Sequence, residues 1–571
     1  MKDYDESSAF LGQWGCFQQV VFFVLAASTI PNGSGVFSIV FLADIPRHHC
    51  LVPDANLTED WLNAVIPIEV TDGEEERSSC SRYRLDVVKN LSSQGLIPGR
   101  DINLTQLEQE SCVDGWSYSK DIYQSTIVSE FDLVCSEQWK QPFTSTVVFL
   151  GVLIGSFIQD SSQTGKTVLF ATMAVQTVFT FVQIFSSSWL MLCVLLFIAG
   201  MGQISNYVSG FVLGIEILTG SVRVLFSSMG VCLGYAVGYM MLPLFAYYLR
   251  NWKSLLLALS LPGLAYIPLW WLIPESPRWL LSQGRVEEAE AIVRKAARWN
   301  KVEAPQVIFE KCKACLTSNQ YIEKIIKSCL LCYGFTLSFI IPFKHFLCLH
   351  LPRFTLSTGY FGLSLNTSRL HADPYLSCFI SAAVEVPAYI ACWLALQYIP
   401  RRVSTICVLL LGGVSLYLIQ LIPQSKHLSV ALEMLGKFGI TSGSSLMYSY
   451  TAELYPTGLR NTATGTYSSA TLIFLSMSVG FLLILISSSP CSGLDFKNLP
   501  YIILGTLCVV SAFATLFLPE SFRRPLPETI QQMHKRGSGQ SSLGNNIQNL
   551  GCLLKQNFDR LKYFMPSLTS F

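Results

Sequence analysis

The chain has 571 residues, of which 51% are hydrophobic and 12% aromatic, whereas only 13% carry a charge. Soluble domains carry about 25% charged residues, so this composition, with a mean hydropathy of +0.42, excludes an ordinary soluble protein. A net charge of +1 gives no support for a nucleic-acid partner.

The N-terminal segment, residues 1–19, is polar and acidic. It lacks the basic start and apolar centre of a cleavable signal peptide. We therefore expect the first apolar segment to direct the chain into the membrane.

Apolar segments of membrane-spanning length recur along the chain. A spanning helix needs about 20 apolar residues, and six such segments precede a polar stretch while six follow it. The predicted helices lie near 20–43, 143–159, 167–187, 189–214, 225–248 and 253–273, and near 328–348, 375–397, 403–423, 428–452, 462–487 and 500–518. These boundaries predict an N-terminal six-helix bundle (20–273) and a C-terminal one (328–518). The 328–348 segment is the least regular, because Pro342, Lys344 and His345 interrupt it.

The polar stretch at 274–327 contains ten Lys and Arg residues. An excess of these residues marks the cytoplasmic side of a membrane. An even number of helices then places both termini, including a polar, disordered tail at 519–571, in the cytosol. We expect a multi-pass protein of the plasma membrane with an extracellular loop at 44–142.

The 44–142 loop has the features of an extracellular segment. It contains glycosylation sequons at Asn56, Asn90 and Asn103. Its cysteines are even in number, which in an oxidising compartment predicts two disulfides. The four cysteines are Cys50, Cys80, Cys112 and Cys135. They can pair in three ways, and the sequence does not choose among them.

Two sequence motifs occur once in each predicted bundle. GIEILTGSVR contains Glu216 and Arg223, and TAELYPTGLR contains Glu453 and Arg460 at the same spacing, 237 residues later. Likewise LIPESPRWLL at 272–281 is echoed by FLPESFRRPL, 245 residues later. Parallel six-helix repeats of this kind build major facilitator transporters, whose substrate site lies between the halves. The predicted fold class is therefore an all-α membrane protein with the major facilitator fold.

The Glu–Arg pairs fall at predicted cytoplasmic helix ends. Charge-assisted bonds there would act as a gate or latch that holds one transport state. The alternative is a set of solvated loop charges of little energetic weight. The repetition in both halves favours the latch.

Several stretches resemble the novel-type organic cation/carnitine transporters of the solute carrier superfamily. They are QLEQESCVDGW, VLFATMAVQT, GMGQISNYV, IPESPRWL and KFGITS…YTAELYPT, and YFGLSLNTSRLHADPYLSCF is closest to the sodium-dependent carnitine members. The resemblance covers most of 1–310 and 359–460. It implies uptake of carnitine with sodium, and of other organic cations without it.

Carnitine joins a quaternary ammonium to a carboxylate, so its site needs aromatic faces and polar donors. The resemblance implies a cavity lined by residues of helices four, seven and ten. For each aromatic residue, ordinary packing is the competing interpretation. The candidates are Gln203, Asn206, Tyr207, Tyr360, Phe361 and Tyr448.

Ionisable residues inside a membrane span indicate function. Glu385 and Lys437 are the clearest, either as part of the transport site or as a structural pair between helices. Asn32, in the TIPNGSG stretch of the first helix, is a sodium ligand by resemblance, because Pro31 and Gly33 would open the helix and free carbonyl oxygens.

The remaining motifs bear on partners and on enzymatic function. The chain ends in SLTSF, and Thr569 and Phe571 fit a PDZ-binding carboxyl terminus. GIEILTGS lacks the lysine of a phosphate-binding loop, so we expect neither nucleotide binding nor an enzyme. We expect no cofactor or metal other than sodium as the coupling ion.

The chain also departs from the family it resembles. The loop between the second and third helices is reduced to QDSSQTGKTV, and the sequence of the seventh helix differs from that of the family. In the eleventh helix, Leu472 stands where the carnitine-type members have an arginine. These departures motivate an alternative function, a transport-impaired homologue that acts as a scaffold through its PDZ-type tail.

Overall fold

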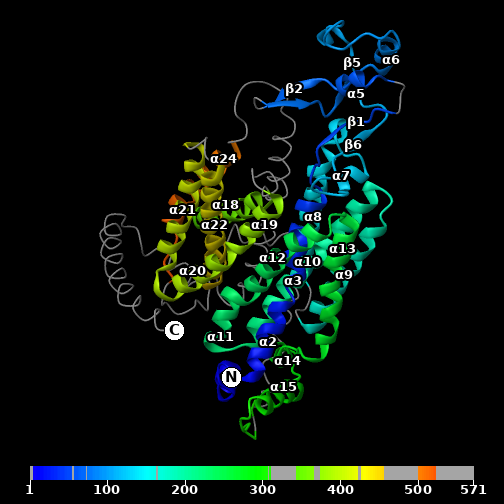
Figure 1. Cartoon of the computed structure of the whole chain (residues 1–571). Helices are drawn as coiled ribbons and strands as arrows, with labels where there is room; N and C mark the ends of the chain where they lie inside the picture. The colour runs from blue at the N-terminus through cyan, green and yellow to red at the C-terminus, as the bar shows by residue number, and fades with distance from the viewer. Residues whose placement is uncertain are drawn as a thin grey trace, which may run out of the picture.

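The computed structural model describes most of the chain as helices in two neighbouring bundles, with a small domain at one end (Figure 1). We call the end with this domain the insertion end, and the opposite end, where the N-terminus lies, the terminal end. The structure describes residues 4–53, 57–71, 74–161, 165–306, 308–309, 343–365, 373–421, 426–454 and 499–521.

The N-terminal bundle contains the six predicted helices, with small shifts of their ends. The first is divided into three consecutive pieces, and the fifth contains a π-helical turn, η5. The elements are α2 (Cys16–Ala27), α3 (Ile30–Phe37), α4 (Ile39–Leu42), α8 (Lys140–Ser161), α9 (Lys166–Val182), η4 (Gln183–Phe185), α10 (Trp189–Ile217), α11 (Gly220–Leu225), η5 (Phe226–Gly230), α12 (Val231–Tyr248), α13 (Trp252–Tyr266) and η6 (Ile267–Trp271).

The C-terminal bundle contains five of its six predicted helices within the described residues. The elements are α18 (Phe343–Leu365), α19 (Pro374–Ala383), α20 (Glu385–Tyr398), α21 (Arg401–Leu421), α22 (Lys426–Leu454) and α24 (Leu499–Thr515), of which α19 and α20 together form the eighth helix. The predicted eleventh helix, 462–487, lies outside the described residues, so the count of twelve stays a prediction.

The seventh helix differs from its prediction. Helix α18 extends well past the predicted end at 348, and residues 328–342 lie outside the described residues. The prediction ended the helix where polar residues appear, but the bundle buries Arg353 at 9% exposure and continues the helix through Pro352. Burial of a long polar side chain against neighbouring helices is a tertiary effect that an apolar window does not register.

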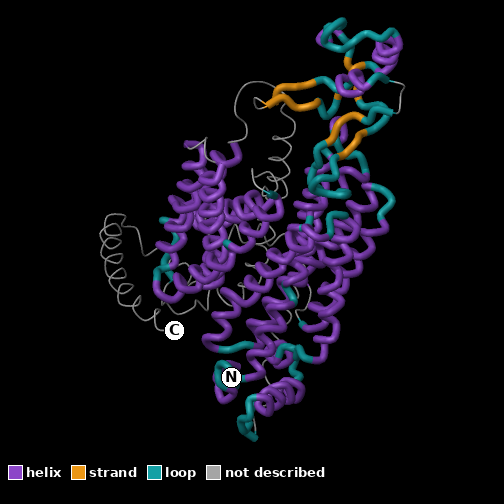
Figure 2. The backbone as a smooth tube through the Cα atoms, viewed as in Figure 1, coloured by secondary structure: helices purple, strands orange, loops and turns teal. Residues whose placement is uncertain are grey.

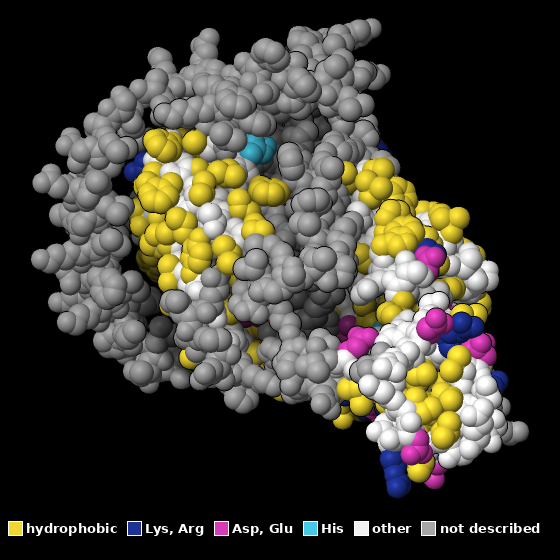
Figure 3. Space-filling model, turned by 90° about the horizontal axis from the view of Figure 1, so that it is seen from above, with side chains coloured by type: hydrophobic (Ala, Val, Ile, Leu, Met, Phe, Trp, Pro, Cys, Tyr) yellow, Lys and Arg dark blue, Asp and Glu magenta, His cyan; other side chains and the backbone are white. Residues whose placement is uncertain are grey.

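The lengths and surfaces of the helices suit a membrane. Seven continuous helical runs in the described residues are long and apolar enough to cross one. Large apolar side chains such as Phe23, Leu190 and Phe513 are more than half exposed on the outside of the bundles. Figure 3, seen from the insertion end, shows hydrophobic side chains along the described flanks. The bundle is therefore apolar outside, where a soluble protein is polar.

The insertion domain is built from three short antiparallel strand pairs and small helices (Figure 2). Its core surrounds Trp61, which is fully buried and donates from its indole nitrogen to the Leu96 carbonyl at 2.7 Å. The pairs are β1 (His48–Cys50) with β6 (Trp116–Tyr118), β2 (Ile68–Thr71) with β3 (Glu74–Arg77) and β4 (Ser81–Tyr83) with β5 (Gln109–Ser111). The helices are α5 (Glu59–Ala64), α6 (Leu85–Ser93), η2 (Leu104–Gln106), α7 (Ile127–Glu130) and η3 (Cys135–Glu137).

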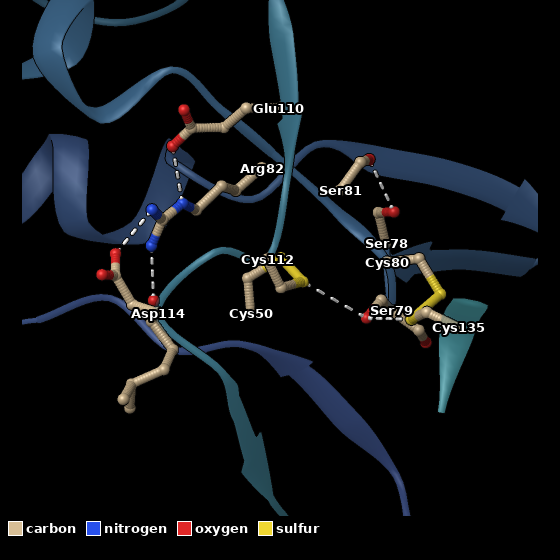
Figure 4. The surroundings of a disulfide bond; sticks show 11 residues. Cys50, Ser78, Ser79, Cys80, Ser81, Arg82, Glu110, Cys112, Asp114 and Cys135 are labelled. Atoms are coloured by element: carbon tan, nitrogen blue, oxygen red, sulfur yellow. Dashed lines mark hydrogen bonds and ion pairs between the residues drawn. A yellow bond between two sulfur atoms is a disulfide. The ribbon is translucent and has the colours of Figure 1, made fainter. Parts of the chain in front are cut away.

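Two disulfides and one buried arginine hold this domain together. The pairing that the sequence left open is Cys50–Cys112 and Cys80–Cys135. Beside the first disulfide, the guanidinium of Arg82 donates to the carboxylates of Glu110 and Asp114, as Figure 4 shows. It also donates to the Leu51 carbonyl. His48 lies within 4.8 Å of both sulfurs of the second disulfide, but oxidised sulfurs are poor metal ligands, so this cluster does not form a metal site.

The terminal end carries α1 (Tyr4–Ser7), η1 (Ala9–Leu11), α14 (Pro277–Ser282) and α15 (Val286–Trp299). Helix α15 buries Ala289, Val293, Ala296 and Ala297, the spacing of one amphipathic face. Asn300 then fixes the helix to the start of the bundle, because it accepts from the Phe17 amide and donates to the Leu11 carbonyl.

The first and fifth helices of the N-terminal bundle approach each other without intervening side chains. A Cβ atom added to Gly238 would lie 2.0 Å from the Ile30 carbonyl oxygen, and one added to Gly33 would lie 2.0 Å from the Tyr235 carbonyl oxygen. Helices α3 and α12 are thus in backbone contact, which only glycine permits at these two positions.

The two bundles meet along the face that α12 presents to the C-terminal half. Near the insertion end, α12 packs on α19, and the Tyr375 hydroxyl donates to the Ile122 carbonyl at 3.0 Å. Toward the terminal end, η5 packs on α20, and Phe211 contacts Tyr448 with ring centroids 5.2 Å apart. Side chains that line this boundary are therefore placed between two bodies.

Candidate functional site

A buried ion pair lies at the boundary between the halves. The Lys437 ammonium is 3.4 Å from a Glu385 carboxylate oxygen, and both side chains are at most 1% exposed. The ammonium also donates to the Ser381 hydroxyl, and the Tyr389 hydroxyl donates to Glu385 at 3.3 Å. The structure thus brings together the two intramembrane charges that the sequence singled out. A buried pair is held in place only with such additional hydrogen bonds.

Aromatic rings from both halves surround this pair. The Lys437 ammonium lies 4.7 Å from the ring centroid of Tyr239, on α12, and 5.8 Å from that of Tyr360, on α18. Phe37 stacks on Tyr239 with centroids 4.1 Å apart and also contacts Tyr360 and Phe361. A cation is therefore already held against aromatic faces at this position, which shows that the rings are oriented to accept one.

The ring contacts continue through the N-terminal half. Tyr235, on α12, contacts both Phe37 and Tyr207, with ring centroids 6.0 Å apart in each case. Tyr207, on α10, is predicted to line the site, and its hydroxyl lies 3.9 Å from the Cys232 sulfur. These contacts make one aromatic series from α10 to α18 across the boundary.

The amide residues predicted for the site form a second cluster in the N-terminal half. Asn32 donates to the Asn206 side-chain oxygen at 2.9 Å, and Asn206 donates to the Leu169 carbonyl at 3.2 Å. Gln203 packs so closely on Gly35 that a Cβ atom there would lie 2.6 Å from its side-chain nitrogen. The Asn32 side-chain oxygen is buried without a hydrogen-bond partner among the described residues. This oxygen could therefore coordinate a cation.

Tyr448 lies farther toward the terminal end of α22. Its ring contacts Phe211 of the other half, and the Arg353 guanidinium lies 5.0 Å from its ring centroid. The predicted substrate residues therefore divide into three groups: Tyr360, Phe361 and Tyr207 in the aromatic series, Gln203 and Asn206 in the amide cluster, and Tyr448 beside Arg353.

At the terminal end of the C-terminal half, Glu453 is the centre of a charged network. It accepts from the Arg401 guanidinium at 2.9 Å and from the Ser521 hydroxyl at 2.7 Å. Glu520 accepts from the backbone amides of Arg401 and Arg402, which begin α21. A carboxylate at a helix N-terminus neutralises the unpaired amides there.

The N-terminal half repeats this arrangement. Glu275 accepts from the backbone amide of Lys166 at 2.8 Å, at the start of α9. The Glu216 carboxylate lies beside the Ser276 hydroxyl and the Arg278 guanidinium. In each half, the glutamate of the Pro-Glu-Ser motif therefore accepts from backbone amides at the start of the third helix. The serine of the motif contacts the glutamate at the end of the fourth helix. The repeated sequence motif thus links the same two helices in both halves.

One arginine of the predicted latch lies within the described residues. The Arg223 guanidinium donates to the Leu218 carbonyl at 2.8 Å, whereas Arg460 lies outside the described residues, so the latch stays a prediction. The guanidinium beside Glu453 belongs to Arg401. The sequence pattern missed Arg401 and Arg278 because both are distant in sequence from the glutamates they approach.

The insertion domain presents two of its predicted glycosylation sites to solvent. Asn90 and Asn103 are exposed, whereas Asn56 lies outside the described residues.

Comparison with known proteins identifies the family. Residues 115–533 match the family described as "Sugar (and other) transporter". The chain is 51% identical over 543 residues to organic cation/carnitine transporter 2 of Rattus norvegicus, covering 93% of this chain and 94% of that one. It is also 51% identical over 540 residues to solute carrier family 22 member 4 of Mus musculus, covering 94% and 95%. The chain is a member of solute carrier family 22.

The fold agrees with this membership. The proton:xylose symporter XylE, a major facilitator superfamily protein, matches with a TM-score of 0.57 and 13% sequence identity, covering 90% of this chain and 99% of that one. The predicted major facilitator fold is confirmed. This family member is a multi-pass membrane transporter and not an enzyme.

Sequence reasoning missed several residues of the site. Tyr239, Tyr235 and Phe37 contact the predicted aromatic residues or the ammonium of Lys437. Glu433, one helical turn before Lys437, accepts from the Tyr501 hydroxyl at 3.1 Å. The available signal was a pair of polar or aromatic residues four apart in an apolar helix, which lie on the same face. Such pairs are the two tyrosines of YAVGY at 235–239 and the glutamate and lysine of EMLGK at 433–437.

Proposed function

We propose that this transporter takes up carnitine with sodium, and other small organic cations without it, across the plasma membrane by alternating access. The observation that carries the proposal is the ammonium of Lys437 held between Tyr239 and Tyr360 beside a buried Glu385. A quaternary ammonium has no N–H donor, so aromatic faces and a carboxylate are the groups that attract it. The names of the family members at 51% identity support this substrate class.

An organic ammonium would compete with Lys437 for these rings. Lys437 has a second carboxylate within its own helix, because Glu433 lies one turn earlier on the same face. Movement of the lysine toward Glu433 would leave Glu385 and the two tyrosine rings to the substrate. The charge of the site would then stay balanced when a cation enters, which keeps the desolvation cost of binding low.

Sodium would bind in the amide cluster of the N-terminal half. The buried oxygen of Asn32 and the break between α2 and α3 support this placement. A sodium ion there would be coordinated by side-chain and backbone oxygens close to the moving boundary.

The test is uptake of radiolabelled carnitine and tetraethylammonium by cells that express the chain, with sodium present and with sodium replaced, after surface delivery is measured. Tyr239→Ala removes one ring, and a desolvated cation–π contact contributes about 2 kcal/mol. The KM for both substrates should then rise about thirtyfold. Tyr248→Ala is the matched control, because Tyr248 lies on the same helix and is 80% exposed.

Uptake no greater than in untransfected cells, despite normal surface delivery, would contradict the proposal. Capture of PDZ-domain proteins by the tail, without uptake, would instead support the scaffold function. Equal effects of the two tyrosine substitutions would show that the rings around Lys437 are packing residues.

A further inference from the structure

Two lysines lie near each other at the terminal end of the N-terminal bundle. Lys166 begins α9, and its ammonium lies 4.4 Å from the centroid of the Trp270 ring. Lys295, on α15, is exposed, and its ammonium lies 5.5 Å from the centroid of the Trp299 ring. Lys295 is also near enough to Lys166 for the two charges to repel each other. The proposed transport cycle uses neither lysine.

These two lysines lack the carboxylate partners that comparable lysines have. At the insertion end, Lys140 and Lys253 also lie over tryptophan rings, but they pair with glutamates at 2.6 and 2.7 Å. Among the described residues, no carboxylate is within ion-pair distance of the Lys166 or Lys295 ammonium. Glu275 attracts Lys166, but its carboxylate accepts from the backbone amide that begins α9. Two like charges held together cost free energy that an anion between them would offset.

The lysine pair lies where the bundle meets the membrane surface. One candidate span begins at Lys166 and another ends at Trp271, and α9 packs on both α13 and η6. Trp271 is 74% exposed, and tryptophan is enriched where headgroups meet the hydrocarbon. The excess of Lys and Arg in 274–327 predicts that this leaflet is the cytosolic one, in which anionic lipids are concentrated. A lipid headgroup is therefore the anion expected at this depth.

The neighbouring outer surface suits the acyl chains of such a lipid. Leu264, Ile267 and Trp271 follow one another at intervals of three and four residues along α13 and η6, so they lie on one helix face. Each of them is at least half exposed. Trp270, next to this apolar face, contacts Phe170 edge to face with ring centroids 4.9 Å apart. The apolar face thus ends beside the ring over which the first ammonium lies.

We propose that Lys166 and Lys295 bind the headgroup phosphate of an anionic phospholipid whose acyl chains lie along Leu264, Ile267 and Trp271. A phosphomonoester carries about two negative charges near neutral pH, which balance the two ammonium groups. The tryptophan rings attract the ammonium groups and so restrict their positions before the lipid binds. An inositol phospholipid with phosphomonoester groups has this chemistry. The site is independent of which substrate the protein transports.

The experiment is a titration of the purified full chain, in a neutral detergent, with dioctanoyl phosphatidylinositol bisphosphate, in which native mass spectrometry counts the bound lipid. In Lys166→Gln/Lys295→Gln the Kd should rise about thirtyfold, because each ammonium near a lipid surface contributes about a factor of five. Lys166→Arg/Lys295→Arg keeps both charges and phosphate donors, so its Kd should stay within about threefold of the wild type. Phosphatidylcholine, which has no net charge, should bind the wild type and the glutamine variant equally.

The matched control is Lys140→Gln/Lys253→Gln, which removes two lysines that also lie over tryptophan rings, at the insertion end. Its Kd should equal that of the wild type. An equal rise in both glutamine variants, or no rise in Lys166→Gln/Lys295→Gln, would overturn the site. Equal affinity for the same headgroup without acyl chains would indicate a site for soluble phosphates and overturn the lipid assignment.

A single substitution keeps the test decisive if the double variant does not fold. Lys295 is exposed on α15, so Lys295→Gln should leave the fold intact and raise the Kd about fivefold. An unchanged Kd in Lys295→Gln would contradict the shared phosphate site.

Discussion

At the scale of single residues, the insertion domain shows how one side chain organises a small core. Arg82 is 3% exposed and binds Glu110 at 2.9 Å, Asp114 at 2.6 Å and the Leu51 carbonyl at 2.7 Å (Figure 4). Leu51 directly follows Cys50, and Asp114 lies two residues after Cys112 along the chain. Arg82 therefore ties the same two segments as the first disulfide, through charge and not through a covalent bond.

Replacement of Arg82 should impair folding of this domain. Arg82→Met removes the buried guanidinium and its hydrogen bonds to two carboxylates, and a hydrogen bond to a charged group contributes about 1.5–3 kcal/mol. We expect most of the protein to stay intracellular with immature glycans, as measured by endoglycosidase sensitivity. Arg84→Met is the matched control, since Arg84 is 44% exposed and surface ion pairs contribute little. Mature glycans on both variants would contradict this role of Arg82.

At the scale of elements, the sequence predicted most helices to within a few residues because spanning length and hydrophobicity are local properties. Two helices differ from this pattern. Helix α18 continues past its predicted end with Arg353 buried against its neighbours. The first helix breaks near Ser28, just before Pro31, which lacks the amide hydrogen that a continuous helix needs. The site was predictable where a charge stands in an apolar span, as at Glu385. Tyr239 was missed, because its local signal, two tyrosines one turn apart at 235 and 239, does not distinguish a site from core packing.

The backbone contact between α3 and α12 gives a test at this scale. Gly238→Ala would place a Cβ atom 2.0 Å from the Ile30 carbonyl, and overpacking of this kind costs about 1–3 kcal/mol. The melting temperature of the purified protein should fall. Gly362→Ala is the control, because the nearest atom to its added Cβ is 3.8 Å away, and alanine is favoured in a helix by about 0.5–1 kcal/mol. Similar melting temperatures for both variants would argue against close backbone contact.

At the scale of the whole molecule, the insertion end of the boundary is closed by aromatic side chains. Tyr375, on α19, stacks on Phe41 with ring centroids 5.5 Å apart and also contacts Tyr123 and Tyr247. One tyrosine of the C-terminal half is thus enclosed by three rings of the other half. Opening of the boundary on this side requires Tyr375 to leave these rings.

Removal of this ring should therefore favour an arrangement that is open at the insertion end. In Tyr375→Ala, we expect a membrane-impermeant maleimide added outside the cell to label Cys378, which is fully buried one turn later on α19. Cys378→Ser in the same background controls for other cysteines, and Tyr248→Ala controls for loss of an exposed tyrosine. No rise in labelling of Cys378 would show that the Tyr375 contacts do not keep this side closed.

The repeated Pro-Glu-Ser tie has a consequence for the energetics of transport. Glu453, Arg401, Ser521 and Glu520 all belong to the C-terminal half, and Glu216, Ser276 and Glu275 all belong to the N-terminal half. Each of these described charges has its partners within its own half, while ring contacts between the halves, such as Phe41 with Tyr375 and Phe211 with Tyr448, join uncharged side chains. Added salt screens charges and leaves ring contacts nearly unchanged. We therefore expect ionic strength to have little influence on which side is open in the proposed transport cycle.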